Sequence, residues 1–188
     1  MRPIKEHTKW MFAEAIFEII KNKELSKIRI TELCDYCNTD RQTFYYHFKD
    51  KYDLIAWIYQ NDLNTSFRQY GNVFCKEQTI LLLNLIKEKQ YFYHRAFADA
   101  NQNSLFSYMR NANCNITEQI YKEHYHIDEL NETQLFKIKY NSYAWVGCLS
   151  EWVSLKCVPA PEIYVDYLYD TSFLVYEKNN STADAPII

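Results

Sequence analysis

The sequence predicts an all-α protein, and three observations support this prediction. The 188 residues contain only two glycines and four prolines, and no proline occurs between Pro3 and Pro159. Folds rich in β-strands need turn residues far more often than this. Apolar residues recur at helical spacing, and they make up 48% of the chain, as in a globular protein. A chain of this length can bury one or two helical cores.

The first helix is expected over residues 8–22. Trp10, Phe17 and Ile20 recur there at helical spacing, with charged residues between them. Residues 24–30 follow as a connector that carries buried apolar anchors.

Two short helices joined by a tight turn come next. Thr31 is a suitable N-cap for the first of them, whose inward face carries Leu33 and Cys37. Asn38 makes the turn, because asparagine tolerates the left-handed conformation that a helix end requires. Asp40 caps the second short helix, which runs to about residue 47.

The remaining chain is also predicted to be helical. Asp50 begins a long helix that ends near Gly71, and five more helices are expected over residues 77–90, 91–100, 104–124, 133–155 and 162–176. Pro159 and Pro161 enforce a short corner, so the last two helices should be antiparallel neighbours. We therefore expect a front domain over residues 1–52, a helical rear domain over 53–178 and a flexible tail over 179–188.

Composition excludes several classes of protein. The net charge is −3, and no signal peptide or run of about 20 apolar residues is visible, so we expect a cytoplasmic protein without a membrane anchor. Cys34 and Cys37 have no second ligand pair, and no paired carboxylates or Gly-rich phosphate loop occur. We therefore expect no metal, no cofactor and no catalytic residues, and hence no enzyme.

Residues 28–54 carry the most informative motif. Leu33, Cys37 and Asn38 lead into Thr43-Phe44-Tyr45-Tyr46-His47-Phe48, with Lys51 and Leu54 following. The segment resembles the DNA-binding domain of the TetR family of bacterial regulators. In that pattern an apolar-x-x-Ala-Gly-Val-Ser turn precedes Thr-[Leu/Phe]-Tyr-x-[His/Tyr]-Phe and x-x-Lys-x-x-Leu. Cys37, Asn38 and Thr39 depart from its Ala, Gly and Val. The sequence also looks like the subgroup that contains the activator of dihydroxyacetone-kinase operons.

The resemblance implies a helix-turn-helix domain at the front, whose recognition helix enters the major groove of DNA. Arg41, Gln42 and Thr43 would then contact base edges. Tyr45 and His47 are also open to a packing role. The expected DNA-binding residues are Thr31, Arg41, Gln42, Thr43, Tyr45, Tyr46, His47 and Lys51, with Thr31 and Lys51 assigned to phosphates.

In the resembled family, the rear domain binds a ligand and forms the dimer. We expect the last two helices to pack as a four-helix bundle with a second copy, through Gly147, Trp152, Tyr164, Tyr167 and Thr171. Candidates for a ligand pocket are the aromatic and apolar residues Tyr93, Phe97, Phe106, Met109, Tyr143, Trp145 and Trp152. Aromatic residues at helical spacing are more often core or interface, and this alternative stays open.

Three hypotheses follow. The first is a homodimeric transcriptional regulator that binds double-stranded operator DNA and is gated by an unknown small molecule. The second places the same DNA-binding domain under a protein co-regulator, as an activator. The third is a helical dimer that acts as an interaction module without DNA binding.

Overall fold

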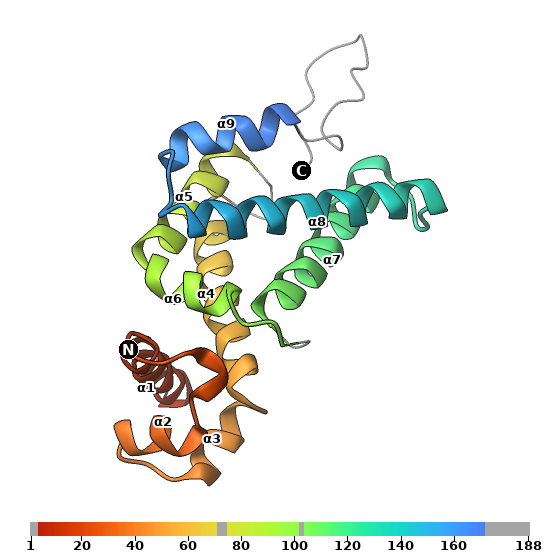
Figure 1. Ribbon diagram of the computed structural model, residues 1–188. Coiled ribbons are helices and arrows are strands. Elements are labelled where there is room, and N and C mark those ends of the chain that lie inside the picture. The colour runs from red at the N-terminus through yellow and green to blue at the C-terminus, as the bar shows by residue number, and fades with distance from the viewer. Residues whose placement is uncertain (1–3, 71–74, 102–103, 172–188) are drawn as a thin grey trace.

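The computed structural model describes residues 4–70, 75–101 and 104–171, which contain helices joined by turns and loops, and no strand. This confirms the predicted fold class. Figure 1 shows the elements in chain order. They are α1 (Ile4–Ile19), the 3-10 turn η1 (Leu25–Lys27), α2 (Ile30–Tyr36), α3 (Arg41–His47), α4 (Lys51–Tyr70), α5 (Lys76–Glu88), α6 (Gln90–Phe97), α7 (Leu105–Tyr125), α8 (Glu132–Ser154) and α9 (Pro161–Thr171).

Helix ends differ from the predictions mainly at α1, which begins and ends earlier than residues 8–22. Its last turn tightens, because the N–H groups of Lys21 and Asn22 bond to carbonyls three residues back, and Leu25 then anchors η1 in the core. The predicted stop at Gly71, the end of the last helix beyond residue 171 and the tail over 179–188 lie outside the described residues.

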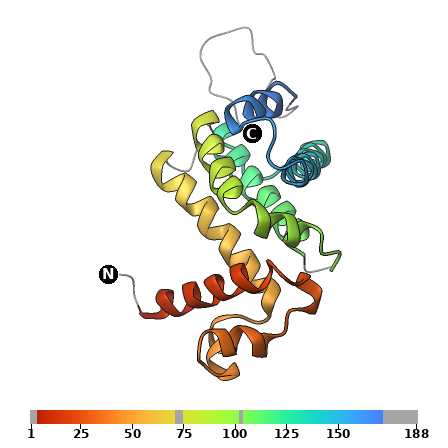
Figure 2. The same cartoon turned by 60° about the vertical axis from the view of Figure 1, so that its left-hand side comes forward.

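Helix α4 links the two ends of the molecule. Helices α1, α2 and α3 gather around its first turns, and α5 to α9 lie beyond them (Figures 1 and 2). Asp50 caps α4 as predicted, since its carboxylate accepts the N–H groups of Tyr52 and Asp53 at 2.8 and 2.9 Å. The helix runs unbroken past the expected boundary between residues 52 and 53.

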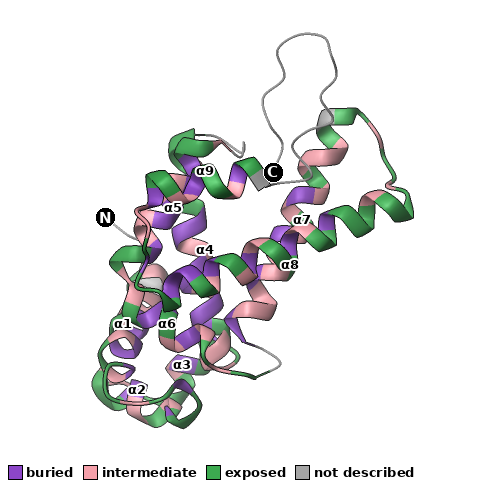
Figure 3. Cartoon of the chain, turned by 45° about the horizontal axis from the view of Figure 1, so that its top comes forward, coloured by how far each residue is buried: buried purple, intermediate pink, exposed green. Residues whose placement is uncertain are grey.

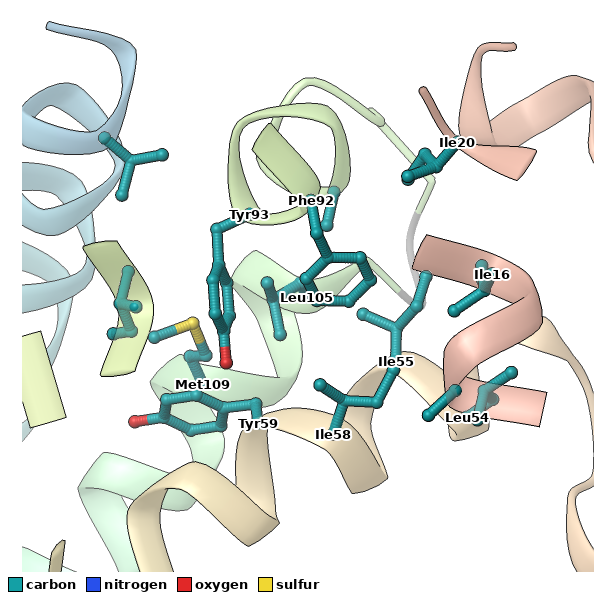
Figure 4. Packing of buried hydrophobic residues seen from close by; sticks show 14 of the residues in the cluster. Ile16, Ile20, Leu54, Ile55, Ile58, Tyr59, Phe92, Tyr93, Leu105 and Met109 are labelled. Carbon is teal, nitrogen blue, oxygen red and sulfur yellow. The ribbon is translucent and has the colours of Figure 1, made fainter. Parts of the chain in front are cut away.

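The hydrophobic core is continuous from the front of the molecule to the rear. On α4, Leu54 and Ile58 are fully buried, and Figure 4 shows Leu54 beside Ile16 of α1. Phe92 of α6 lies near Ile55 in the same view and meets Phe17 of α1 edge to face, at 5.0 Å between ring centres. The front helices therefore share their core with α6 as well as with α4.

One charged group lies inside this core. Asp62 of α4 is only 4% exposed; its carboxylate accepts hydrogen bonds from Lys89 Nζ at 2.7 Å and from the buried Tyr93 hydroxyl at 2.5 Å. Burial raises the pKa of Asp62, and its two donors oppose this shift. The pair of bonds joins α4 to the α5–α6 junction.

Helices α8 and α9 do not form the close antiparallel pair that the proline corner predicted. The most extensive packing of α8 is against α7, and α9 lies mainly against α5. Val165 and Tyr169 turn the apolar face of α9 toward α5, where Tyr169 and Thr79 share a hydrogen bond. Figure 3 shows exposed residues along the outer sides of both helices. The short corner itself is present, between Leu155 and Pro161.

We expect Tyr93→Phe to lower the free energy of unfolding by about 1–3 kcal/mol, because the buried Asp62 carboxylate loses a donor. That donor favours the ionised form, so the loss should shrink as the pH falls and Asp62 takes up a proton. Urea unfolding between pH 4 and pH 8 measures both effects, with Tyr36→Phe at an exposed position as the control. A loss that stays constant with pH would contradict the role given to Asp62.

Candidate nucleic-acid interface

The turn between α2 and α3 is built by a left-handed residue and a side-chain cap. Asn38 has φ 49°, as expected for a residue that replaces glycine at this place. The Thr39 N–H then bonds to the Cys34 carbonyl at 3.0 Å. Asp40 caps α3 as predicted: its carboxylate accepts the Thr43 N–H at 2.7 Å, and this bond lowers the pKa of Asp40. The turn at Asn38 and the Asp40 cap thus fix the orientation of α3 relative to α2.

One face of helix α3 is buried against the core, and the opposite face is exposed. Phe44 and Phe48 are buried against α1, and Phe44 meets Phe12 edge to face at 5.1 Å. Since α3 has only seven residues, these two anchors set its orientation. The opposite face is therefore directed outward.

The outward face carries four of the predicted DNA-binding residues. Arg41 and Gln42 are exposed, and Tyr45 and Tyr46 are 48% and 66% exposed. The Arg41 guanidinium lies 5.7 Å from the centre of the Tyr45 ring and donates to its hydroxyl at 3.4 Å. This arrangement restrains the long Arg41 side chain against Tyr45 while its remaining N–H groups stay available to a partner.

Thr43 and His47 are less accessible. Thr43 is half-buried, and both its backbone N–H and its hydroxyl are engaged by the Asp40 cap. His47 is also half-buried, with its ring 4.9 Å from that of Tyr46. Both side chains are less exposed than those of Arg41 and Tyr46, so their assignment to DNA stays a prediction.

The structure gives Lys51 a different role from the predicted phosphate contact. Its ammonium donates to the carbonyls of Leu25, Ser26 and Ile28 at 2.7, 2.8 and 3.0 Å. All three N–H groups are therefore used, and burial lowers the pKa of Lys51. Lys51 ties the start of α4 to η1 and positions the helix-turn-helix. The sequence could not reveal this, because the carbonyls belong to a connector 23 or more residues away.

The start of α2 also differs from prediction. Thr31 is not its N-cap, because α2 begins at Ile30 and the cap position belongs to Arg29. The Glu32 carboxylate accepts the Arg29 N–H at 2.8 Å and pairs with Lys23 at 2.6 Å. Thr31 remains exposed in the first turn. Arg29, whose side chain is exposed beside it, is a basic residue that sequence reasoning missed.

Cys34 is buried and Cys37 is half-buried, and the two are separate thiols. The Cys34 Sγ donates to the Asp40 carbonyl and the Cys37 Sγ to the Met11 carbonyl. Burial raises both pKa values, that of Cys37 to about 11. Within the described residues, no group of three His, Cys, Asp or Glu side chains is placed to hold a metal ion.

The seven pocket candidates do not converge on one space. Tyr93 is bonded to Asp62, Trp152 donates its indole N–H to the Pro159 carbonyl at the α8–α9 corner, and the exposed Tyr143 lies under the Arg110 guanidinium. Trp145 lines a small enclosed cavity. The other three belong to the core or pack against it: Phe97, Phe106 and Met109. Helical spacing marked these residues as inward-facing but could not show which helix each one meets.

The predicted dimer residues fall into four groups. Trp152 is 1% exposed within one copy, so it cannot contribute surface to an interface, and this part of the prediction is wrong. Tyr164 is half-buried, stacks on Trp152 and donates to the Cys148 carbonyl at 2.7 Å. Gly147 and Tyr167 face outward, with Tyr167 56% exposed. Thr171 ends α9, and its side chain lies outside the described part of the chain.

Comparison with known proteins identifies the class. Residues 75–173 match the family TetR_C_8, described as a transcriptional regulator C-terminal region. The chain is 27% identical over 144 residues to the HTH-type dhaKLM operon transcriptional activator DhaS of Lactococcus lactis subsp. lactis (strain IL1403), covering 73% of this chain and 74% of that protein.

Solved structures agree in fold. The dihydroxyacetone kinase operon activator DhaS superposes with a TM-score of 0.60 at 19% identity, over 87% of this chain and 92% of that one. A TetR transcriptional regulator from Streptococcus agalactiae 2603V gives 0.64 at 17% identity, over 89% and 94%. The fold and the matched region define a transcriptional regulator with a helix-turn-helix at its front. The chain belongs to the TetR family.

In the part of the chain that the structure describes, no helix combines the length and the apolar character that crossing a bilayer requires.

We expect Lys51→Met to destabilise the protein by about 1.5–3 kcal/mol, because three carbonyls lose a charged donor. The thermal midpoint should fall accordingly, whereas Lys49→Met, at an exposed neighbouring position, should leave it nearly unchanged. Equal midpoints for the two variants would contradict the structural role of Lys51.

Proposed function

We propose that this TetR-family regulator binds operator DNA as a homodimer, with α3 in the major groove. The observation that carries the proposal is the outward face of α3, where Arg41, Gln42 and Tyr46 are exposed while Phe44 and Phe48 anchor the helix behind them. Arginine pairs with guanine and glutamine with adenine through two hydrogen bonds each. The side chains that read bases are therefore present on a rigidly held helix.

Phosphate contacts would surround this face. The exposed residues Thr31 and Arg29 lie at the start of α2, and the exposed Lys49 lies between α3 and α4. We assign them to the DNA backbone in place of Lys51. Tyr45, Thr43 and His47 complete the proposed contact surface around Arg41.

The dimer would form through the outer face of α8. Phe136 and Tyr140 are 68% and 53% exposed, Tyr143 is 44% exposed, and Gly147 follows on the same side of the helix. On α9, Ile163 and Tyr167 add exposed apolar surface. Exposed apolar surface of this kind is typical of a contact with another chain. Two copies would place two recognition helices on one duplex, since one α3 touches too few base pairs for useful specificity.

Regulation would act on the spacing of the two recognition helices through α4. A relative is named an activator of the dhaKLM operon, which favours activation as the outcome. A small-molecule effector and a protein co-regulator both remain compatible with this scheme. The protein would act in the cytoplasm, where the DNA of a bacterial regulator lies.

We expect Arg41→Ala to weaken binding to the selected operator by about 1–3 kcal/mol and to relax specificity at one base pair per half-site. The operator would be identified by sequence selection, and affinities would be measured over a range of salt concentrations. Lys87→Ala, which removes an exposed charge from α5, serves as the control. The proposal fails if no duplex shows salt-dependent binding, or if both variants bind like the wild type.

We expect Gly147→Leu to leave the monomer folded and to weaken the dimer at least tenfold. Apart from its chain neighbours and the backbone of its own helix, no described atom lies within 4 Å of a Cβ added at Gly147, and leucine favours the helix. A second α8 packed there would meet the new side chain. Sedimentation equilibrium measures the dissociation constant, and Asn115→Leu, at an exposed position of α7 instead of α8, is the control. An unchanged dimer would place the interface elsewhere.

A further inference from the structure

The Arg41 side chain is directed along α3 by its contact with Tyr45, one helical turn further on. The guanidinium carbon lies 5.7 Å from the centre of the Tyr45 ring, and Nη2 donates to the Tyr45 hydroxyl at 3.4 Å. Arg41 is the first residue of α3, where the partial positive charge of a helix N-terminus disfavours a cation. The contact with Tyr45 takes the guanidinium away from that end, and the electron-rich face of the ring attracts it.

Tyr45 is suited to this role because its own ring is held in place. The ring meets Phe44 edge to face, at 5.7 Å between ring centres, and Phe44 is fully buried against Phe12. An aromatic side chain also has few rotatable bonds, so it loses little entropy when it is fixed. The position of the Tyr45 ring is therefore set by the core behind α3.

Other charged and aromatic side chains near Arg41 have different partners. Within the described part of the chain, no salt bridge includes Arg41. The neighbouring Asp40 carboxylate accepts the Thr43 N–H, and the Tyr46 ring lies against His47. Tyr45 is therefore the side chain that determines where the Arg41 guanidinium is presented.

A restrained guanidinium costs less to bind than a mobile one. Arginine has many side-chain rotamers, and fixing them at an interface opposes binding. Tyr45 uses one N–H group of Arg41, and the guanidinium keeps enough donors for the pair of bonds that reads a guanine. The contact thus lowers the entropy that Arg41 loses on DNA and leaves the base-reading donors available.

We propose that Tyr45 is a positioning residue, which holds the Arg41 guanidinium ready for one guanine of the operator half-site. Tyr45 completes the contact surface by orienting Arg41 rather than by binding DNA directly. This role rests on the function proposed above. It differs from the direct DNA contact that the sequence predicts for Tyr45.

Double-mutant cycles on the selected operator test the proposal. Fluorescence anisotropy of the full chain with duplexes altered at one base pair locates the guanine that Arg41→Ala no longer distinguishes. At this position Tyr45→Ala should reduce the preference for guanine about twofold to fivefold, the strength of an exposed cation–π contact, and leave other positions unchanged. Tyr45→Phe keeps the ring and should retain most of the preference.

The effect of Tyr45→Ala should vanish in the Arg41→Ala background, because Tyr45 acts through that side chain. Tyr46→Ala is the matched comparison, since it removes the adjacent ring, which lies against His47. Any loss that it causes should be the same in both backgrounds.

A Tyr45→Ala loss that is equal on every duplex and persists in the Arg41→Ala background would overturn the proposal, because it would indicate a direct phosphate contact. A loss with Tyr45→Phe as large as that with Tyr45→Ala would also overturn it. If Tyr45→Ala does not fold, Tyr45→Leu, which keeps an apolar side chain beside Phe44, gives the same comparison. A chain that binds no duplex refutes the function proposed above, whereas operator binding with additive effects of Arg41 and Tyr45 refutes the role of Tyr45 alone.

Discussion

The rest of the structure depends on the continuity of α4. This one helix carries Leu54 and Ile58 in the core beneath the helix-turn-helix, and Leu63 and Ser66 in the core of the rear helices. A helix interior resists bending unless it contains proline or glycine, and α4 contains neither. Any change in packing around its second half is therefore passed to its first half as a movement of the whole helix, and α2 and α3 must follow.

A second attachment limits what that movement can be. Phe17 of α1 meets Phe92 of α6, and the Tyr91 hydroxyl donates to the Lys21 carbonyl at the end of α1. The front unit consists of helices α1 to α3 with η1, and the Lys51 ammonium bonds it to the start of α4 through the carbonyls of η1 and Ile28. Because the front helices are held both by α4 and by α6, a displacement of α4 relative to α6 turns the front unit instead of bending it. Movement of rigid units about packed contacts is a common basis of switching in proteins.

Much of the structure of the front unit could be predicted from the sequence, because the residues that determine it are close together in the chain. The Asn38 turn, the Asp40 and Asp50 caps and the buried pair Phe44 and Phe48 each depend on neighbours within a few residues. The roles that were assigned wrongly depend on distant partners. Lys51 meets carbonyls of η1, and Trp152 turns into the α8–α9 corner, and periodicity alone cannot show which distant group a side chain meets. The same reason explains why helical spacing could not separate pocket from core.

The polar groups along α4 restrict how this helix can sit against the rear helices. Asp62 is bonded to Lys89 and Tyr93, and Ser66 to Gln78, so the helix meets α5 and α6 through directional bonds as well as apolar contacts. Apolar contacts tolerate small slides, whereas these bonds hold only in one register, and a buried polar group that loses its partner is destabilising. Such bonds favour a few discrete positions of α4 over a continuous range.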